Sequence, residues 1–226
     1  MSQLQSYIIY EDNHLFVINK PVGRLVQGDA TGDEPLNETV KTYIKQKYNK
    51  PGNVYLGVVH RLDRPTSGVL VFAKTSKALS RLNKQFSERQ TQKIYWAMVK
   101  NKPKATQARL VHYLKRKPKQ NKSYAYPKSI PGAKQAVLNY RLLKSLKHYH
   151  LLEIELETGR HHQIRSQLSY IGCPIKGDLK YGAKRSNFDG GIDLHARKLS
   201  LIHPTTKEKM CFEADLPHNN LWQSVL

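Results

Sequence analysis

Hydrophobic and polar residues follow a strand-like pattern at the start of the chain and a helical one from residue 36. The runs 7–10 and 15–19 are apolar and β-branched, and Asp12-Asn13 between them is typical of a turn, so two strands are predicted. Residues 24–35, with glycines and acidic side chains, predict a loop. Apolar positions within 36–48 then fall on one face of a helix.

The rest of the chain predicts mostly strands. The expected strands lie at 55–59, 68–74, 93–99, 107–114, 136–143, 149–156, 194–202 and 209–214. Ser76 is expected to cap a helix with Leu82 facing inward, and 162–171 has the spacing of a second helix. A short C-terminal helix around Trp222 is expected to close the core. Strands with interspersed helices predict an α+β fold with a large, mostly antiparallel sheet.

The segment 115–134 is basic and interrupted by Pro118, Pro127 and Pro131, which predicts a mobile loop or the tip of a hairpin. An RNA-contacting arm and a solvated loop are equally good interpretations of its charge. In the first interpretation the RNA-binding residues are Lys115, Arg116, Lys117, Lys119 and Lys122.

Length and composition narrow the class of protein. A chain of 226 residues favours one domain, 1–226, around one core. The longest apolar run, 69–73, is strand-sized and far too short to span a membrane. The first basic residue is Lys20, so we expect no secretory or mitochondrial leader and a cytoplasmic protein. Cys173 and Cys211 form neither a disulfide framework nor a zinc-type spacing.

Net charge indicates the partner. The chain has 38 Lys and Arg against 17 Asp and Glu, a formal charge of +21. Such an excess favours polyanion binding, most commonly nucleic acid, over a basic surface kept for solubility. Charge alone does not separate RNA from DNA, or an enzyme from a binding module.

One polar loop, 60–67, lies between two predicted apolar strands and contains the candidate catalytic residues. It contains Asp63 flanked by Arg61 and Arg64, and Pro65 restricts its shape. Asp63 is a candidate nucleophile or base that an arginine would keep ionised. On spacing alone, an aspartate that forms a salt bridge in a turn is the more common interpretation.

The motif His60-Arg61-Leu62-Asp63-x-x-Thr66-Ser67-Gly68 closely resembles the catalytic motif of the RluA-type pseudouridine synthases. Further motifs of that family are matched in order by Asn19-Lys20-Pro21-x-Gly23, Lys93-x-Tyr95-x-Ala97-x-Val99, Thr158-Gly159-Arg160-x-His162-Gln163-Ile164-Arg165, Gly172-x-Pro174-Ile175-x-Gly177-Asp178-x-x-Tyr181-Gly182, and Leu194-His195-Ala196-x-x-Leu199 with His203-Pro204. The resemblance spans 7–216 and implies the pseudouridine synthase fold with a central active-site cleft, here without the N-terminal S4 domain of many members. The chain departs from the common pattern at Gln27-Gly28, where a His-Pro pair is frequent, and slightly at 133–136.

The resemblance implies roles for three catalytic residues and no cofactor. Asp63 is the essential carboxylate, which either attacks C1′ of the target nucleotide or removes its C2′ proton. Arg165 pairs with that carboxylate. Tyr95 stacks on the extruded uracil; its hydroxyl, with an ordinary pKa near 10, is a poor unaided base for the C5 proton.

Substrate-binding residues follow from the same motifs. Arg61 fills the gap that the flipped base leaves in the RNA stack. His60 and His162 are expected to position the substrate, together with Gln163 and Ile164. Adjacent histidines without a nearby acid are a poor zinc pattern, so no metal is expected.

Three functions are compatible with these residues. The first is isomerisation of a flipped uridine in a stem-loop of ribosomal or transfer RNA to pseudouridine, with no membrane and no obligatory protein partner. The alternative is a noncatalytic RNA-binding or ribosome-assembly module on the same fold, against which the intact Asp63, Tyr95 and Arg165 argue. A DNA glycosylase would share the charge and the aspartate but not the motifs.

Overall fold

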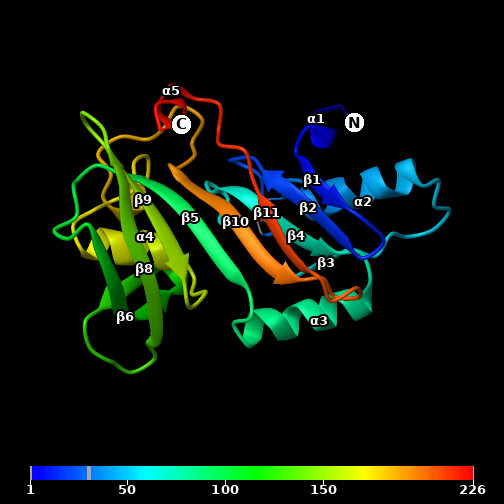
Figure 1. The fold of residues 1–226 in the computed structure, drawn as a ribbon, viewed down its shortest axis with the longest axis horizontal. Coiled ribbons are helices and arrows are strands. Elements are labelled where there is room, and N and C mark those ends of the chain that lie inside the picture. The colour runs from blue at the N-terminus through cyan, green and yellow to red at the C-terminus, as the bar shows by residue number, and fades with distance from the viewer. Residues whose placement is uncertain (1, 30–31, 226) are drawn as a thin grey trace. The chain divides into compact units, whose positions relative to one another are not determined.

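The structure, a computed structural model, describes residues 2–29 and 32–225 (Figure 1). These residues form two compact units. Unit 1 is built from the described part of 1–91 together with Ala196–Pro217, and unit 2 from Gln92–His195 with the described part of 218–226. The expected loop 24–35 is confirmed except for 30–31, which lie outside the described residues. The single catalytic domain over 1–226 stays a prediction.

The β-layer of unit 1 is formed by strands from both ends of the chain. Its strands are β1 (Ile8–Glu11), β2 (Leu15–Lys20), β3 (Gly57–Val58), β4 (Ser67–Ala73), β10 (Leu194–Ile202) and β11 (Lys209–Glu213). The order is β1-β2-β4-β10, with β11 pairing with β10 and β3 with β4. The pairs β1–β2, β2–β4, β3–β4 and β10–β11 are antiparallel. All seven residues of β4 are buried, which makes it the central strand of this layer.

Two predictions for unit 1 are wrong in detail. The strand expected at 55–59 is reduced to β3, because Tyr55 is exposed and only Gly57 and Val58 pair with β4. The helix α3 (Ser76–Ser87) is capped by Thr75, not Ser76, since the Thr75 side chain accepts the Ala78 amide proton.

The helices of unit 1 are α1 (Ser2–Gln5), α2 (Leu36–Lys47) and α3. Helix α3 packs its buried Ala78 and Leu82 against a core cluster that includes Val69, Val71 and Leu199. The apolar residues at helical spacing thus pack against β4 and β10, and their burial helps to hold β4, the strand that the Asp63 loop enters, in place.

Unit 2 is a second antiparallel β-layer with one packed helix. Its strands are β5 (Gln92–Val99), β6 (Gln107–Lys117), β7 (Lys122–Tyr126), β8 (Lys134–Ser145) and β9 (His150–Leu156), in the order β5-β9-β8-β6-β7. Its helical segments are α4 (Gln163–Tyr170), α5 (Asn220–Gln223) and the 3₁₀ turns η1 (Pro118–Gln120) and η2 (Leu179–Tyr181). Ile164 and Leu168 of α4 join the core of the layer, and Trp222 of α5 is buried, as predicted.

The basic segment 115–134 is a hairpin for most of its length. Strand β6 continues to Lys117, and β7 pairs with it in antiparallel register from Lys117↔Lys122 to Tyr113↔Tyr126. Of the two predicted alternatives, the hairpin is therefore confirmed. We call residues 113–126 the basic arm.

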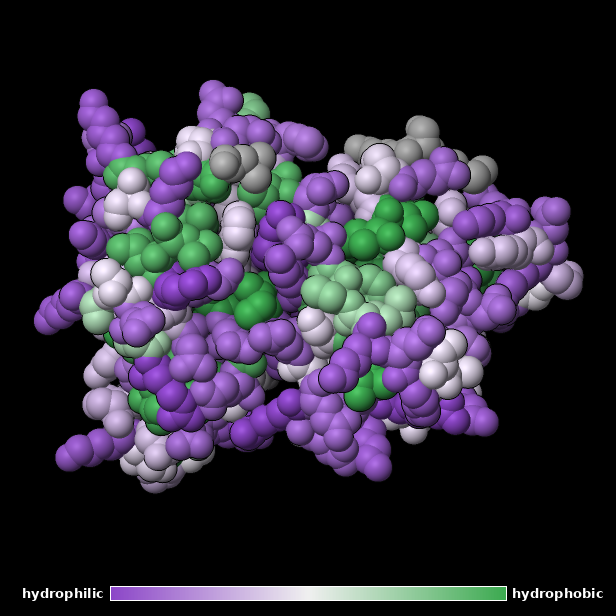
Figure 2. Space-filling model, in the orientation of Figure 1, coloured by the Kyte–Doolittle hydropathy of each residue, from purple (hydrophilic) through white to green (hydrophobic). Residues whose placement is uncertain are grey.

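The predicted α+β class is confirmed, since both units combine antiparallel strands with helices. Hydrophilic side chains cover most of the face shown in Figure 2, and hydrophobic ones appear there in separate patches. Within 2–29 and 32–225, no helix is long and apolar enough to cross a membrane.

Candidate active site

The loop that carries Asp63 is closed by backbone geometry in unit 1. It joins β3 to β4, and the Thr66 amide donates to the Asp63 carbonyl at 2.9 Å. Directly after it, Gly68 has a φ of 115° and lies against β10. A Cβ at that position would be 2.3 Å from the Ala196 carbonyl oxygen, so only glycine fits. The loop therefore enters β4 in one fixed direction.

A buried lysine ties the Asp63 loop to the end of β2. Lys20 is fully buried, and its ammonium donates to the carbonyls of Pro21 (3.0 Å), Arg24 (2.9 Å) and Arg64 (3.2 Å). Burial lowers the pKa of Lys20 to about 7, and the Asp63 carboxylate opposes this shift. Lys20 thus places an amine that titrates near neutral pH beside the loop of the predicted catalytic carboxylate. Lys20 lies within a family motif, but its burial and its contacts are not predictable from the motif alone.

The neighbouring residues complete this attachment. Gly23 and Arg64 exchange two hydrogen bonds, Gly23 N–H to the Arg64 carbonyl (2.9 Å) and Arg64 Nε–H to the Gly23 carbonyl (3.0 Å). The Arg64 guanidinium also pairs with Asp33 at 2.8 Å. Of the two arginines beside Asp63, Arg64 is thus a structural tether, whereas Arg61 is exposed.

His60 supports the loop from the other side. Its Nε2 accepts the Val71 amide proton at 3.1 Å, and its ring stacks on Phe86 with centroids 5.0 Å apart. The histidine therefore links the loop to β4 and α3. Its predicted part in substrate binding stays a prediction.

In unit 2, Arg165 is held rigidly near the start of α4. Its Nε and Nη2 donate to the two carboxylate oxygens of Asp178 at 2.7 and 2.9 Å, and both side chains are buried. The guanidinium carbon also lies 5.0 Å from the centre of the Tyr181 ring. Sequence reasoning missed this partner, although Asp178 and Tyr181 both lie within a family motif.

His162 is the N-cap of α4 in a left-handed conformation, with a φ of 52°. Its Nδ1 lies 3.0 Å from the Tyr181 hydroxyl, and its ring stacks on His161 at 3.8 Å. Burial, followed by the neighbouring charge of Arg165, lowers the pKa of His162 to about 2. The ring is therefore neutral at physiological pH and suits a positioning role better than proton transfer.

Gln163 and Ile164 lie within the fold of unit 2. The Gln163 side chain accepts from the Thr158 hydroxyl (2.7 Å) and the Arg160 amide (2.9 Å), and donates to the Val137 carbonyl (3.1 Å). Ile164 belongs to the core cluster against which Tyr95 of β5 packs. Tyr95 and Ile164 thus belong to the same hydrophobic core in unit 2.

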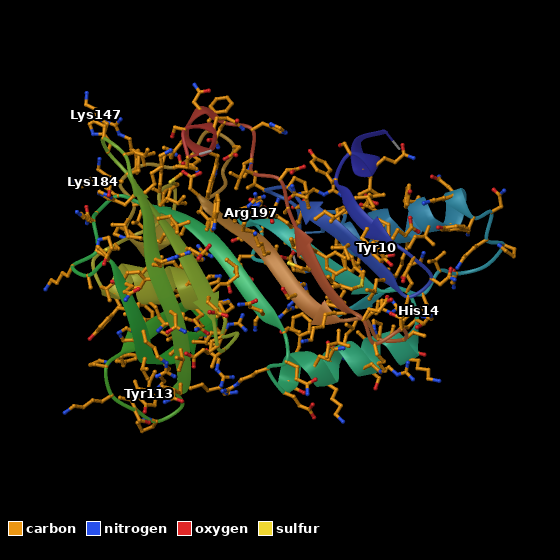
Figure 3. The ribbon with its side chains drawn as sticks, in the orientation of Figure 1. Tyr10, His14, Tyr113, Lys147, Lys184 and Arg197 are labelled. Atoms are coloured by element: carbon orange, nitrogen blue, oxygen red, sulfur yellow. The ribbon has the colours of Figure 1, made fainter. Side chains whose placement is uncertain are left out.

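The basic arm joins the same group of residues. Of its five cations, Lys115, Arg116, Lys117 and Lys119 are exposed, and Lys122 is half-buried. Lys117 and Lys122 place their ammonium groups 4.9 and 5.2 Å from the centre of the Tyr124 ring. Near the tip, the Ser123 amide donates to the Tyr181 hydroxyl at 2.9 Å. Tyr113, labelled in Figure 3, marks the other end of the arm.

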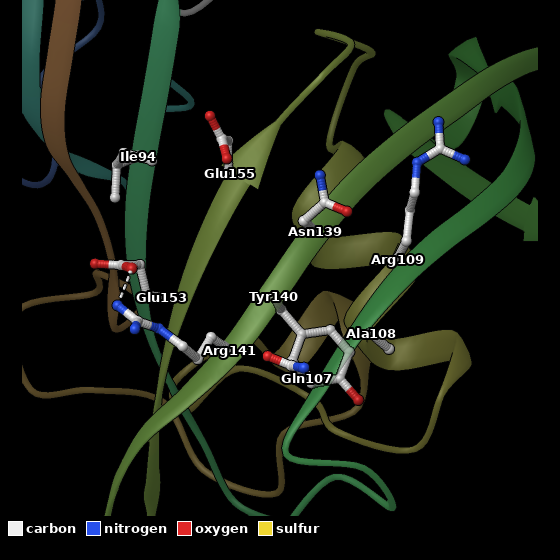
Figure 4. Close-up of a pocket in the computed structure, with 9 residues that line it drawn as sticks. All are labelled: Ile94, Gln107, Ala108, Arg109, Asn139, Tyr140, Arg141, Glu153 and Glu155. Carbon is white, nitrogen blue, oxygen red and sulfur yellow. Dashed lines mark hydrogen bonds and ion pairs between the residues drawn. The ribbon is translucent and has the colours of Figure 1, made fainter.

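A cavity elsewhere in unit 2 contains none of the predicted site residues. Its volume is about 460 Å³, and its lining is drawn in Figure 4. Glu153 and Glu155 line it, and Glu153 pairs there with Arg141 at 2.9 Å. Arg109 and Arg141 also line it, so its charges balance and the cavity offers a polyanion no net positive charge.

Residues 14–170 match the family model described as RNA pseudouridylate synthase. The chain belongs to this family. It is 36% identical over 214 residues to an uncharacterized RNA pseudouridine synthase of Synechocystis, covering 93% of this chain and 65% of that protein. It is 35% identical over 222 residues to the ribosomal large subunit pseudouridine synthase D of Zymomonas mobilis, covering 94% and 69%. The chain thus spans about two thirds of the length of these relatives.

A solved structure supports the family at the level of the fold. The human RNA pseudouridylate synthase domain containing 4 superposes with a TM-score of 0.80 at 27% identity, over 96% of this chain and 91% of that one. Pseudouridine synthases are isomerases, so this family identifies the kind of enzyme to which the residues above belong.

Within the chain, the structure groups the predicted residues in two sets. Unit 1 holds Asp63 with His60 and Arg61, and unit 2 holds the other predicted residues. The ion pair between Arg165 and Asp63 stays a prediction, and so do the individual roles of these residues.

Proposed function

We propose that this chain isomerises a specific uridine in a stem-loop of ribosomal or transfer RNA to pseudouridine. The observation that carries the proposal is the loop of Asp63, a family motif held in one conformation by Lys20, Arg64 and Gly68. A rigid scaffold that presents one carboxylate on a short loop is typical of a catalytic group. Family membership supplies the reaction class.

The reaction is an internal rearrangement of one nucleotide. The C1′–N1 bond breaks, the uracil turns while held by the enzyme, a C1′–C5 bond forms, and the C5 proton leaves to be replaced at N1. Asp63 either forms a temporary bond to C1′ or removes the C2′ proton to give a glycal. No oxidant, reductant or energy source is required.

The other residues hold the substrate. Tyr95 stacks on the detached uracil and limits its rotation. Arg165, fixed by Asp178, supplies a positive charge that keeps the Asp63 carboxylate ionised. Arg61, exposed next to Asp63, fills the place of the flipped base in the RNA stack.

RNA selection is assigned to the basic surface. Flipping costs least where a base is already unpaired, which favours a loop or bulge over a continuous duplex. The exposed cations of the basic arm contact phosphates of the adjoining stem. One relative is named for the large ribosomal subunit, which supports ribosomal RNA as the first substrate to test and the cytoplasm as the location.

The test is to express the chain in cells that lack their own related synthases and to map pseudouridine across total RNA. The wild type is compared with Asp63→Asn, which keeps the shape of the side chain and removes its charge. Asp215→Asn, at an exposed position of unit 1, is the matched control. We expect one modified uridine in the wild type and the control, and none in Asp63→Asn.

Two results would overturn the proposal. A new pseudouridine in all three strains would show that the activity does not require the Asp63 carboxylate. RNA that copurifies with the chain while no pseudouridine appears, even in RNA from the native organism, would favour the noncatalytic RNA-binding module.

A further inference from the structure

Phe188 in unit 2 is a large apolar residue that lies on the protein surface. It is fully exposed, at 110% of its reference area, whereas the next large apolar side chain among the described residues, Leu179, is at 57%. Phe188 lies in the segment 183–193, between η2 and β10. An aromatic ring left wholly in water adds nothing to the hydrophobic stabilisation of the fold. Single exposed apolar residues are common on protein surfaces, so the ring points to a ligand only together with the cavity and the charges near it.

The backbone around Phe188 is firmly attached. The preceding Asn187 accepts from the Lys176 ammonium at 2.6 Å and donates to the Asp193 carboxylate at 3.1 Å. Lys176 and Asp193 also pair with each other at 2.9 Å, and the Gly190 amide donates to the Asn187 carbonyl at 3.1 Å. The backbone that carries Phe188 is therefore held in place, so binding at the ring does not have to order this segment.

A cavity of about 550 Å³ lies beside this ring. Its lining includes Lys176, Asn187, Phe188, Asp189, Asn219 and Asn220. All of these residues belong to unit 2. The volume is within the range of small-ligand sites, and amide, hydroxyl and carboxylate groups offer both donors and acceptors. An aromatic face next to such groups suits a planar base with polar edges.

Cations close to Phe188 in the sequence favour a nucleic acid over a protein. Lys184 and Arg185, four and three residues before it, are exposed, and within the described part of the chain neither forms an ion pair. Lys184 is labelled in Figure 3 at the outer margin of unit 2, away from Tyr113 of the basic arm. Unpaired cations next to an aromatic ring are the usual combination for single-stranded nucleic acid.

We propose that Phe188 and the adjoining cavity form a second RNA site, which binds one unpaired base of the substrate outside the catalytic loop. The base stacks on Phe188 with its edge toward Asn219 and Asn220, and the flanking phosphates contact Lys184 and Arg185. This proposal rests on the proposed function, because it takes the substrate to be RNA. It adds a contact between the protein and an unpaired base beside the stem that carries the target uridine.

The test measures binding of the full chain to fluorescent oligouridylate and oligoadenylate of about ten nucleotides, a length within the usual site sizes, and to an RNA duplex of the same length. The variants are Phe188→Ala, Phe188→Leu and Phe188→Trp. Stacking on one aromatic side chain contributes about 1–3 kcal/mol, roughly a 5- to 150-fold change in affinity. We expect Ala and Leu to weaken single-strand binding by about tenfold, Trp to retain it, and duplex binding to stay unchanged. Leu143→Ala, at an exposed apolar position of β8, is the matched control and should bind as the wild type does.

Salt dependence separates stacking from charge. Phe188→Ala should leave the slope of log Kd against log salt unchanged. Replacing both Lys184 and Arg185 by glutamine should reduce that slope by about 1.4, the value for two phosphates of a single strand. Equal reductions in both variants would contradict the assigned roles.

Three outcomes would overturn the proposal. The first is that the wild type does not bind the single strands, and the second is that Phe188→Ala binds them with wild-type affinity. The third is that Phe188→Leu binds them with wild-type affinity, because this would indicate a general apolar contact such as a protein surface. Pseudouridine mapping of the same variants keeps the two proposals distinct. If pseudouridine formation depends on Asp63 but not on Phe188, the proposal of a second site is wrong and the proposed isomerase stands. If RNA stacks on Phe188 but no pseudouridine forms, the proposed isomerase is wrong and the second site stands.

Discussion

Arg165 and Asp178 form a buried two-point ion pair, with Nε–Oδ2 at 2.7 Å and Nη2–Oδ1 at 2.9 Å. The pair fixes the plane of the guanidinium, because two parallel hydrogen bonds leave it no rotation. Arg165 is the arginine that the family motif assigns to the active site. Because Asp178 holds its guanidinium, Asp178 determines the position of this positive charge.

Replacing Asp178 with asparagine should impair both stability and catalysis. It leaves a buried arginine without its carboxylate, which costs about 3–5 kcal/mol in the free energy of unfolding. We also expect kcat to fall by about 100-fold, the effect of misplacing a catalytic group by about 1 Å. Urea unfolding and single-turnover kinetics at saturating RNA measure the two effects separately. An Asp178→Asn enzyme with wild-type kcat would show that Arg165 needs no such support.

Patterns in the sequence located most elements but not the partners of the site. Alternation and helical spacing identified β5 and α4, because each buries one regular face. The pattern failed at 55–59, where apolar residues are present but Tyr55 lies in solvent. It also could not assign Asp178 to Arg165, since a motif match gives the identity of a residue and not its contacts. Lys20 was missed for the same reason, as its three carbonyl acceptors come from the backbone.

Lys20 should make stability depend on pH in the alkaline range. Its folded-state pKa is about 7, well below the value of 10.5 for an exposed lysine. Between these values the unfolded chain binds more protons than the folded one, so Lys20 contributes increasing stability as the pH rises from 7 toward 10.5. Below pH 7 its contribution is constant, since both states are protonated.

The measurement compares urea unfolding of the wild type and Lys20→Met at several pH values from 6 to about 10, spanning the shifted and ordinary pKa. The wild type should gain stability relative to the variant as the pH rises. A difference that stays flat across the range would show that Lys20 is ionised throughout, held by its three carbonyls.

Gly68 should tolerate no side chain. Alanine there would need a φ of 115° and a Cβ 2.3 Å from the Ala196 carbonyl oxygen, so β4 or β10 has to move. We expect Gly68→Ala to destabilise the fold by about 3 kcal/mol or more, which corresponds to a fall in Tm of roughly 6–12 °C. Gly52→Ala is the matched control, because nothing lies within 4 Å of its added Cβ. Equal melting temperatures for the two variants would contradict the close approach of β4 and β10.

The basic arm should affect which RNA is bound and not the chemistry. Lys115 and Lys119 are exposed. Ser123 near the tip contacts Tyr181, whose ring centre lies 5.0 Å from the guanidinium carbon of Arg165. Deleting the arm would therefore disturb the group around Arg165 as well. Charge neutralisation at Lys115 and Lys119 is the sharper change, because it leaves these contacts intact.

Lys115→Gln combined with Lys119→Gln should reduce the slope of log affinity against log salt by about 1.8 for a double-stranded stem. Lys45→Gln with Lys50→Gln removes the same charge from exposed positions of unit 1 and is the control. We expect the arm variant to raise KM and to change the pseudouridine map, with kcat at saturating RNA unchanged. If both double variants shift binding equally, the RNA responds to total charge and the arm has no special role. If kcat falls while KM stays constant, the arm acts through Tyr181 on the catalytic arginine instead of through phosphate contacts.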